Sequence, residues 1–459
     1  MRIEVDRLTW LPCQDINVDG VKRELTQKIT PYRGDPEDVF LYDDTSRPGF
    51  LGVPRRWGIL KFGPHVSNVT DLTTLPAIAW PDTSSIAYWP GQADSVEALL
   101  RALNRPLMRK GTGALLEAGC GAGKTLMGLS VASRLCTPTL IVVPKTDLAE
   151  QWHNTANAFF PGVRVGHVQG AKRVYEDCHL TTARVQTLHL QRDKLVDFWK
   201  AFGLIIYDEG HRFPARTFMT SLDHPHARYR LGVSATWRRA DGMECAWQFH
   251  VGVVEHISQV PKLTGKYVQV KYEPQAWLND HKFCYSGWPP NNSKYITAIS
   301  EDVGYNNWLL GIIKDGAAKG RQLLVASDRV AQLTWLRRQL ELSPYTSALY
   351  IGQVPTDGKT KSGKPKTRKM TKQEVEDAKK ANVVLATYHM MSEGTDIPSL
   401  DTLILATPRV DVEQIVGRIR RPADKKDLLV VDCHLDTVWY NSLAAARRKV
   451  YDRIGFKQH

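Results

Sequence analysis

The stretch that decides the fold of this chain is Ala118-Gly119-Cys120-Gly121-Ala122-Gly123-Lys124-Thr125. It follows the apolar run 114–116 and precedes the apolar segment 126–132, an order that predicts a strand, a glycine-rich loop and a helix. Glycines allow the loop to turn its backbone N–H groups toward phosphate oxygens, and the N-terminus of the following helix adds a positive dipole. Lys124 is then placed to reach the β- and γ-phosphates of a nucleotide, and the Thr125 hydroxyl to bind Mg²⁺.

This loop predicts a site for a nucleoside triphosphate. The strict pattern begins with Gly, and this chain has Ala118 there. A glycine-rich turn followed by a chance Lys-Thr is the alternative, and the strand–loop–helix context disfavours it. The expected phosphate-binding residues are Gly121, Ala122, Gly123, Lys124 and Thr125.

Composition indicates a globular protein and is compatible with an anionic partner. The 459 residues suggest two to four domains, and 42% hydrophobic with 24% charged residues indicates folded cores. The net charge of +13 and a pI near 9.3 favour a polyanion, nucleic acid first. A charge that serves only solubility is an equally good explanation of these two numbers.

The cysteines and the N-terminus predict a protein that stays inside the cell. None of the seven cysteines forms a CxxC pair or a Cys/His set with zinc-ligand spacing, which fits reduced thiols. The N-terminal residues contain no apolar signal region, and no apolar run approaches about 18 residues. We therefore expect an intracellular, cytoplasmic protein without membrane contact.

Apolar runs divide the chain into parts. Runs that are apolar on both faces are typical of parallel strands covered by helices on both sides of the sheet. Such runs lie at 140–143 and 204–207, and again at 323–326, 383–386, 402–406 and 428–431. We expect an α/β protein with a small N-terminal DNA-binding domain at 1–75, a first α/β domain at 76–262 and a second at 263–459.

Two basic stretches allow more than one interpretation. Arg55-Arg56-Trp57 places two arginines beside an aromatic ring, which could grip a phosphate and stack on a base, or could be a solvated basic turn. The segment 357–372 is rich in lysine and has almost no apolar residue. It predicts a mobile surface loop, which could contact nucleic-acid phosphates or only water.

Asp208-Glu209-Gly210-His211 is the second chemical motif. It follows the predicted strand 204–207, so its carboxylates lie at the edge of the sheet where the phosphate loop also lies. Asp208 would hold Mg²⁺, mostly through water, and Glu209 would orient and deprotonate the attacking water. His211 could couple the nucleotide to neighbouring loops.

With these two motifs in this order, the chain resembles the superfamily 2 helicases of the DExH type from about Gln92 to Pro422. Further segments that carry the resemblance are Val143–Trp152 (motif Ia), Thr181–Leu188 (motif Ib), Gly232–Thr236 (motif III), Ala386–Pro398 (motif V) and Gln414–Arg421 (motif VI). The resemblance implies two tandem RecA-like domains behind a small N-terminal α+β domain, and the use of ATP and Mg²⁺.

The resemblance also implies roles at the nucleotide. Gln92 would read the adenine, and Gly394 and Asp396 would lie near the nucleotide at the domain interface. Arg418 and Arg421 would be arginine fingers, which stabilise transition-state charge only when the two domains close. The expected catalytic residues are Lys124, Asp208, Glu209, Arg418 and Arg421.

The same resemblance implies contacts to nucleic acid and a set of coupling residues. Threonines that follow strands or begin helices would touch a strand's backbone, which is independent of base sequence. The expected nucleic-acid contacts are Lys145, Thr146, Thr187, Arg239 and Thr387. The expected coupling residues are His211, Ser234, Thr236 and Gln414.

Within superfamily 2, three features are similar to the group of the repair helicase XPB and the phage branch-migration helicase UvsW. They are the segment Trp237–Gly242, the form of motif VI and Tyr350–Gly352. Ala240 stands where XPB-like proteins carry Glu, so this chain departs from their pattern there. The compact length and the small N-terminal region look more like the phage enzyme.

The sequence therefore predicts an ATP-dependent DNA helicase that remodels forked and branched DNA. We expect it to act as a monomer beside replication or recombination proteins. An aromatic wedge at the fork would be Trp57, Trp237 or Trp288. Three alternatives stay open: a duplex translocase of a restriction-type system, an RNA helicase, and a nucleic-acid-binding scaffold without ATPase activity. The intact catalytic set argues against the scaffold.

Overall fold

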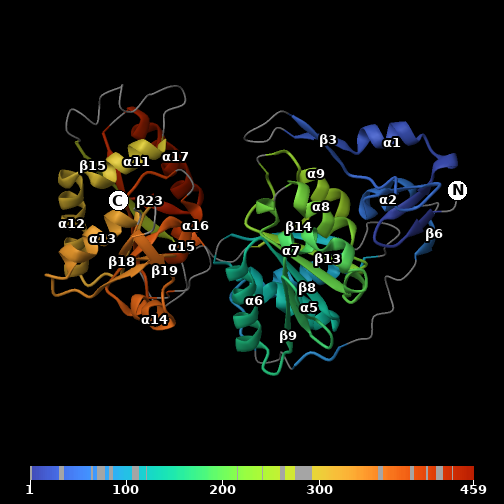
Figure 1. Ribbon diagram of the computed structural model, residues 1–459, viewed down its shortest axis with the longest axis horizontal. Helices are drawn as coiled ribbons and strands as arrows, with labels where there is room; N and C mark the ends of the chain where they lie inside the picture. The colour runs from blue at the N-terminus through green and yellow to red at the C-terminus, as the bar shows by residue number, and fades with distance from the viewer. Residues whose placement is uncertain are drawn as a thin grey trace. The chain divides into compact units, whose positions relative to one another are not determined.

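The computed structural model describes residues 3–29, 36–63, 66–69, 78–81, 86–105, 113–119, 121–213, 215–239, 241–258, 264–273, 292–359, 365–392, 397, 399–409, 412–419, 427–436 and 438–459. The chain forms two compact units, unit 1 at Met1–Pro261 and unit 2 at Lys262–His459. Figure 1 shows the ribbon with many of the helix and strand labels used below. No helix in the described part of the chain is long and apolar enough to cross a membrane.

Unit 1 is built on a sheet of eight strands in the order β10-β9-β11-β8-β12-β13-β7-β14. Its strands pair in parallel, except that β10 runs antiparallel to β9 at the edge. The strands are β7 (Gly113–Glu117), β8 (Thr139–Val143), β9 (Val165–Gln169), β10 (Lys172–Val174), β11 (Leu180–Arg184), β12 (Leu204–Asp208), β13 (Tyr229–Ser234) and β14 (Val254–Ile257).

Alternate residues of the central strands enter two different cores. In β8, Leu140 and Val142 belong to one hydrophobic cluster, whereas Ile141 and Val143 belong to the other. A strand with both faces buried reads as a continuous apolar run, because neither face carries polar residues. The helices that cover the sheet are α3 (Gln92–Leu103), α5 (Lys124–Leu135), α6 (Thr146–Phe159), α7 (Val185–Leu190), α8 (Ala215–Asp223) and α9 (Glu244–His250).

The N-terminal residues form small sheets of their own within unit 1. A four-stranded sheet has the order β5-β2-β1-β6, and β3 pairs with β4. Their apolar side chains share a hydrophobic cluster with the large sheet, so the two sheets have a common core. The elements are β1 (Ile3–Val5), β2 (Thr9–Pro12), α1 (Val18–Glu24), β3 (Thr26–Ile29), β4 (Glu37–Phe40), β5 (Phe50–Val53), α2 (Arg55–Phe62) and β6 (Val66–Val69).

The idea that Arg55 grips a phosphate is wrong. Arg55 is 2% exposed, and its guanidinium donates to the carbonyls of Ala227 at 2.7 Å and Arg228 at 3.0 Å. Trp57 is also buried, and its indole N–H donates to Glu24 at 3.1 Å. The sequence could not show this, because the carbonyls that satisfy Arg55 lie more than 170 residues away.

Replacing Arg55 by Met should therefore loosen the N-terminal sheet. The change leaves two carbonyls without their donor, and an unmade buried hydrogen bond costs about 1–3 kcal/mol. The amide hydrogens of β1 and β2 should exchange faster, by the factor in rate that corresponds to this loss of free energy. Arg56→Met is the matched control, because the Arg56 contact to the Gln248 carbonyl is exposed. Equal effects of the two variants would contradict this role of Arg55.

Unit 2 is built on a parallel sheet of seven strands in the order β17-β20-β16-β21-β22-β15-β23. Helices flank this sheet, and their apolar side chains pack with those of the strands into two hydrophobic clusters. The predicted α/β class is thereby confirmed. The strands are β15 (Gly265–Tyr272), β16 (Leu323–Ser327), β17 (Ser347–Tyr350), β20 (Val383–Thr387), β21 (Thr402–Leu405), β22 (Leu428–Leu435) and β23 (Phe456–Gln458). The helices are α11 (Asn292–Glu301), α12 (Val303–Ala318), α13 (Val330–Leu340), α14 (Lys372–Lys380), α15 (Tyr388–Ser392), α16 (Glu413–Ile419) and α17 (Val438–Arg453).

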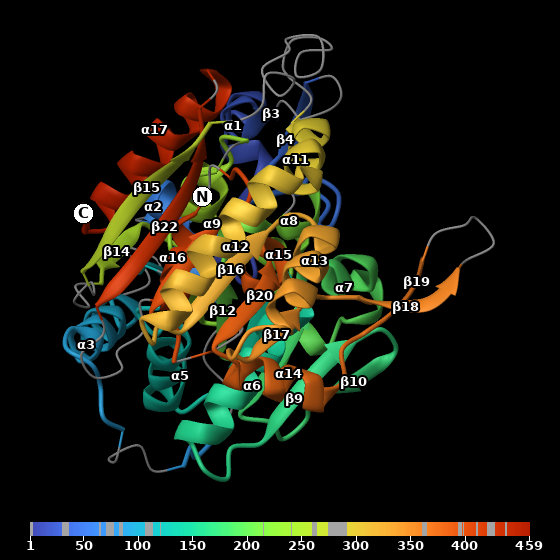
Figure 2. The ribbon, with the colours of Figure 1, turned by 90° about the vertical axis from the view of Figure 1, so that its left-hand side faces the viewer.

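The basic segment is not wholly the loop that its composition predicts. Its two arms form the antiparallel strands β18 (Val354–Lys359) and β19 (Pro365–Arg368), and Figure 2 shows this ribbon extending away from the sheet of unit 2. Residues 360–364 lie outside the described residues. Arg368 forms an ion pair with Glu374, and Glu374 also completes a capping box with Thr371 at the start of α14. This local pairing anchors one end of the ribbon.

Candidate functional site

The phosphate loop joins β7 to α5 as the sequence predicts. Gly121 and Gly123 have φ angles of +81° and +80°, which side chains disfavour, so glycine is needed at both positions. The backbone N–H of Ala118 donates to the Ser234 carbonyl at 2.8 Å and ties the start of the loop to β13. Cys120 lies outside the described residues.

Gln92 lies directly behind this loop. It is 1% exposed, its Nε2 donates to the Ala122 carbonyl at 2.9 Å, and its Oε1 accepts from the Trp89 N–H at 2.9 Å. A Cβ placed on Gly123 would lie 2.2 Å from Gln92 Nε2, so glycine also gives this amide its room. Gln92 thus supports the loop, and its contact to adenine stays a prediction.

Lys124 and Glu209 form an ion pair at the centre of the site. Lys124 Nζ lies 3.2 Å from Glu209 Oε1 and 3.3 Å from the Ala118 carbonyl. Both side chains are nearly buried, with 11% and 13% exposed. The pair brings together the residues expected to bind phosphate and to activate water, although they lie 85 positions apart in the sequence.

Asp208 ends β12 and is buried beside this pair. Its Oδ2 accepts a hydrogen bond of 2.8 Å from Trp152 Nε1. Burial and the neighbouring Glu209 carboxylate raise the pKa of Asp208 above its ordinary value, whereas Lys124 opposes this rise. The Thr125 hydroxyl and the Asp208 carboxylate are oxygen donors of the kind that Mg²⁺ takes, so the residues fit this ion.

The backbone at Glu209 has an unusual conformation. Its φ of +52° lies in the left-handed region, which costs a residue with a side chain roughly 1 kcal/mol. The Glu209 N–H donates to the Val233 carbonyl at 3.0 Å, which holds this turn against the end of β13. Such strain is most often kept where function needs one side-chain position.

His211 connects the carboxylate pair to the segment after β13. Its Nδ1 lies 2.8 Å from Ser234 Oγ and 3.3 Å from Glu209 Oε2. The Ser234 hydroxyl donates to the Thr236 carbonyl at 2.6 Å. Three of the four expected coupling residues therefore lie in one chain of contacts.

The expected nucleic-acid contacts of unit 1 lie in different surroundings. Lys145 is the N-cap of α6 and Thr146 its first residue, and both are half-buried. Thr187 is 7% exposed within α7. The Arg239 guanidinium is 4% exposed and donates to Asp241 and to the carbonyls of Gly210 and Phe213. Arg239 thus holds the turn that follows Glu209.

Unit 2 places its expected residues at the carboxyl ends of its strands and on α16. Thr387 ends β20, and its Oγ1 accepts from the Met390 N–H at 3.4 Å. Arg418, on α16, donates through Nε to the Met391 carbonyl at 2.6 Å. The backbone of Gln414 lies in α16, but its side chain lies outside the described part, as do Gly394, Asp396 and Arg421.

Two of the three candidate wedge residues are not available at the surface. Trp57 and Trp237 are 7% and 6% exposed, and Trp237 Nε1 donates to the Leu116 carbonyl at 3.1 Å. As core residues they cannot insert between strands, so both candidates were wrong. Trp288 lies outside the described residues.

The sequence pattern missed the contacts of Gln151 and Trp152. Both residues were assigned to motif Ia without a role of their own, yet Trp152 reaches Asp208 and Gln151 reaches Thr125. Helical spacing shows that Trp152 lies on one face of α6, but it cannot show which carboxylate that face meets.

A glycine loop at a helix start, beside a carboxylate pair that ends a neighbouring parallel strand, defines a phosphate-loop nucleotide-binding protein. Residues 85–239 match the family model described as "Type III restriction enzyme, res subunit". The chain is 28% identical over 392 residues to a mimivirus protein whose name marks it as a candidate ATP-dependent RNA helicase, covering 83% of this chain and 70% of that protein.

Two further comparisons agree with this match. The chain is 24% identical over 398 residues to the DNA 3'-5' translocase XPB2 of Sulfurisphaera tokodaii, covering 79% of this chain and 84% of that protein. The crystal structure of the Pyrococcus furiosus Hef helicase domain has a TM-score of 0.51 at 14% identity, covering 78% of this chain and 97% of that domain. These similarities are consistent with a superfamily 2 helicase, and the two α/β units have the architecture of RecA-like domains.

Proposed function

We propose that this protein is an ATP-dependent DNA helicase or translocase that remodels forked and branched DNA. The observation that carries the proposal is the buried cluster of Lys124, Glu209 and Asp208, because a scaffold without ATPase activity has no use for it. Burying these charges side by side costs desolvation free energy. Such clusters occur most often at functional sites, where their chemistry is used.

In this proposal each residue of the cluster has a separate task. Lys124 leaves Glu209 for the nucleotide's phosphates, so that the freed Glu209 carboxylate can orient and deprotonate water. Mg²⁺, held through Thr125 and Asp208, would supply positive charge to the phosphate oxygens. Arg418 and Arg421 would act as arginine fingers on the same phosphates.

His211 is the proposed link from hydrolysis to movement along nucleic acid. Its contacts to Glu209 and Ser234 support this, because a change at the carboxylate alters the partner available to the imidazole. Contacts to backbone phosphates at Lys145, Thr146 and Thr387 would make this movement independent of base sequence. The N-terminal residues would bind duplex arms, in an intracellular setting with replication or recombination proteins.

An RNA helicase is the second candidate, because the mimivirus relative is named for RNA. A duplex translocase is the third, because the matching family model is named for a restriction enzyme. A panel of forks, four-way junctions, plain DNA duplexes and RNA duplexes separates the three. Branch migration of junctions supports the proposal, activity confined to RNA duplexes favours the second candidate, and movement without strand separation favours the third.

Replacing Lys124 by Ala should abolish nucleic-acid-stimulated ATPase activity while nucleic-acid binding stays within about twofold. Loss of such a phosphate-binding cation costs at least about 10²-fold in rate. Phosphate release and fluorescence anisotropy measure the two properties. Lys319→Ala is the control, because Lys319 is 66% exposed in a surface ion pair with Asp315. Unchanged ATPase activity in the Lys124 variant would show that the site is misassigned.

A further inference from the structure

Helix α6 contacts both residues expected to hold Mg²⁺. Trp152 Nε1 donates to Asp208 Oδ2 at 2.8 Å, and Gln151 Nε2 donates to Thr125 Oγ1 across a longer 3.5 Å. The two ligands come from β12 and α5, so neighbouring residues of one helix touch two separate elements. The indole N–H is a donor only, so it fixes which carboxylate oxygen faces α6.

The Trp152 ring is held firmly in this position. It has no exposed surface and belongs to the core between the sheet and its helices. A Cβ on Gly128 of α5 would lie 2.7 Å from Trp152 Cη2, so glycine at this position lets the ring approach the helix of the phosphate loop. A ring packed this closely cannot rotate to follow Asp208, so a movement of α6 displaces the hydrogen-bond donor.

The same helix begins at an expected contact to nucleic acid. Lys145 is its N-cap and Thr146 its first residue, whose Oγ1 accepts from Arg184 Nη1 at 3.5 Å. Trp152 lies six positions further on, about 9 Å along the helix axis. Both residues belong to one continuous helix, so a shift of α6 as one body at Thr146 would also displace Trp152.

We propose that α6 transmits nucleic-acid binding to the metal ligands, with Trp152 as the positioning residue for Asp208 and Gln151 for Thr125. Nucleic acid at the N-terminus of α6 would set the helix where Trp152 orients Asp208 for Mg²⁺. This would raise the ATPase rate only on nucleic acid. The inference rests on the proposed function, because it assumes that nucleic acid stimulates hydrolysis.

Trp152→Phe tests the role of the hydrogen bond, since phenylalanine keeps an aromatic ring but has no N–H. Partners that orient metal ligands are typically worth 10–100-fold in metal affinity or activity. We expect Mg²⁺ to support binding of a fluorescent ATP analogue only at about tenfold higher concentration. We expect stimulation by nucleic acid to fall about tenfold, while affinity for nucleic acid stays within about twofold.

Trp199→Phe is the matched control. Trp199 is 3% exposed in the same unit, and its indole N–H donates to the Arg192 carbonyl at 3.5 Å rather than to a ligand residue. We expect this variant to keep the Mg²⁺ dependence and the stimulation of the original protein. A Trp152 variant that melts at a lower temperature but keeps both properties would show a role in packing alone and overturn the inference.

Thr146→Ala tests the path along α6. If Thr146 and Trp152 act through one helix, the double variant should lose little more stimulation than the worse single variant. Multiplied losses would mean that the two residues act separately, and would overturn the proposed path. If no nucleic acid stimulates the ATPase activity of the original protein, the proposed function is contradicted instead. The Mg²⁺ titration would then still show whether Trp152 positions Asp208 for the metal ion.

Discussion

Glu209→Gln should reduce ATP hydrolysis by about 10²–10⁴-fold, the range that a positioned general base contributes. The amide keeps the shape of the carboxylate but cannot take a proton from water. Nucleotide binding should persist or become tighter, because Lys124 loses the carboxylate that lies 3.2 Å from its Nζ. Single-turnover hydrolysis and binding of a fluorescent ATP analogue measure the two properties.

Glu176→Gln serves as the control for this change, because Glu176 is exposed in the same unit. It should keep the full rate. Hydrolysis at the normal rate by the Glu209 variant would mean that another group activates water. Loss of hydrolysis together with loss of nucleotide binding would mean that Glu209 shapes the loop instead of acting as a base.

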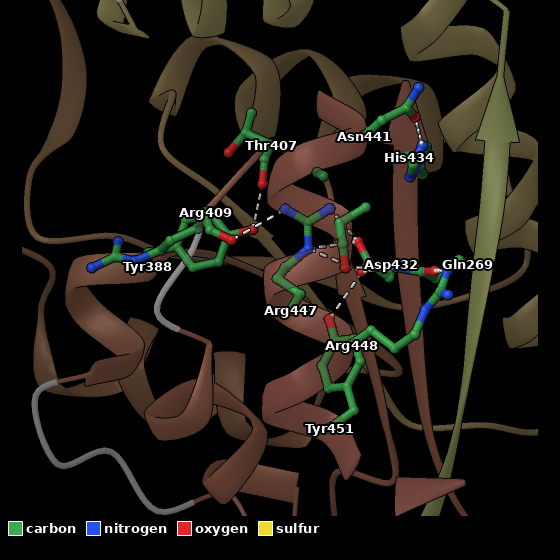
Figure 3. Close-up of polar contacts among 12 residues, drawn as sticks. Gln269, Tyr388, Thr407, Arg409, Asp432, His434, Asn441, Arg447, Arg448 and Tyr451 are labelled. Carbon is green, nitrogen blue, oxygen red and sulfur yellow. Dashed lines mark hydrogen bonds and ion pairs between the residues drawn. The ribbon is translucent and has the colours of Figure 1, made fainter. Parts of the chain in front are cut away.

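The second large effect is expected at the ion pair between Asp432 and Arg447 in unit 2. Figure 3 shows the Arg447 guanidinium against Asp432, and the two side chains are 1% and 0% exposed with a closest separation of 2.8 Å. Burial alone would lower the pKa of Arg447, but the Asp432 carboxylate raises it above its ordinary value. Tyr451 and Gln269 donate to the same carboxylate at 3.2 Å.

Asp432→Ala should destabilise unit 2 by about 3–5 kcal/mol, because it leaves the Arg447 charge buried without a partner. Hydrogen exchange followed by mass spectrometry should show faster exchange in β22 and α17, while unit 1 is unchanged. Replacing both residues by apolar ones, as Asp432→Leu with Arg447→Met, should recover part of this loss, because no unpaired charge is then buried. A single variant as stable as the original protein would mean that water or another group compensates the charge.

The exposed pair of Asp315 and Lys319 provides the control for this prediction. Both side chains are 66% exposed at a distance of 2.7 Å. Exposed pairs contribute about 0–1 kcal/mol, because water screens the charges and the side chains lose entropy. Asp315→Ala should therefore leave exchange in unit 2 almost unchanged.

The buried pair also explains how the C-terminal helix supports the segment before α16. Arg447 Nη1 donates to the Arg409 carbonyl at 3.2 Å, and Arg409 lies over the Tyr388 ring at 4.9 Å from its centroid. The Tyr388 hydroxyl donates in turn to the Thr407 carbonyl at 2.7 Å. One network thus joins α17, the segment after β21 and the start of α15 (Figure 3).

The sequence by itself determined the class of fold and the order of the chemical motifs. Glycines at 121 and 123 are needed by a loop with positive φ, and the run 204–207 followed by Asp208 marks a buried strand with a carboxylate at its end. Such local requirements are readable because they depend on neighbouring residues and on the period of the apolar pattern.

The tertiary structure alone decided which polar residues are free to act. Arg55 and Arg239 resemble surface cations in the sequence, yet both side chains are buried. Carbonyls far along the chain accept from Arg55, and Arg239 is held by Asp241 and by the carbonyls of the turn after Glu209. Trp152 resembles an ordinary core residue, yet its N–H reaches Asp208. The direction of a side chain depends on what packs against it, and one sequence pattern does not contain that information.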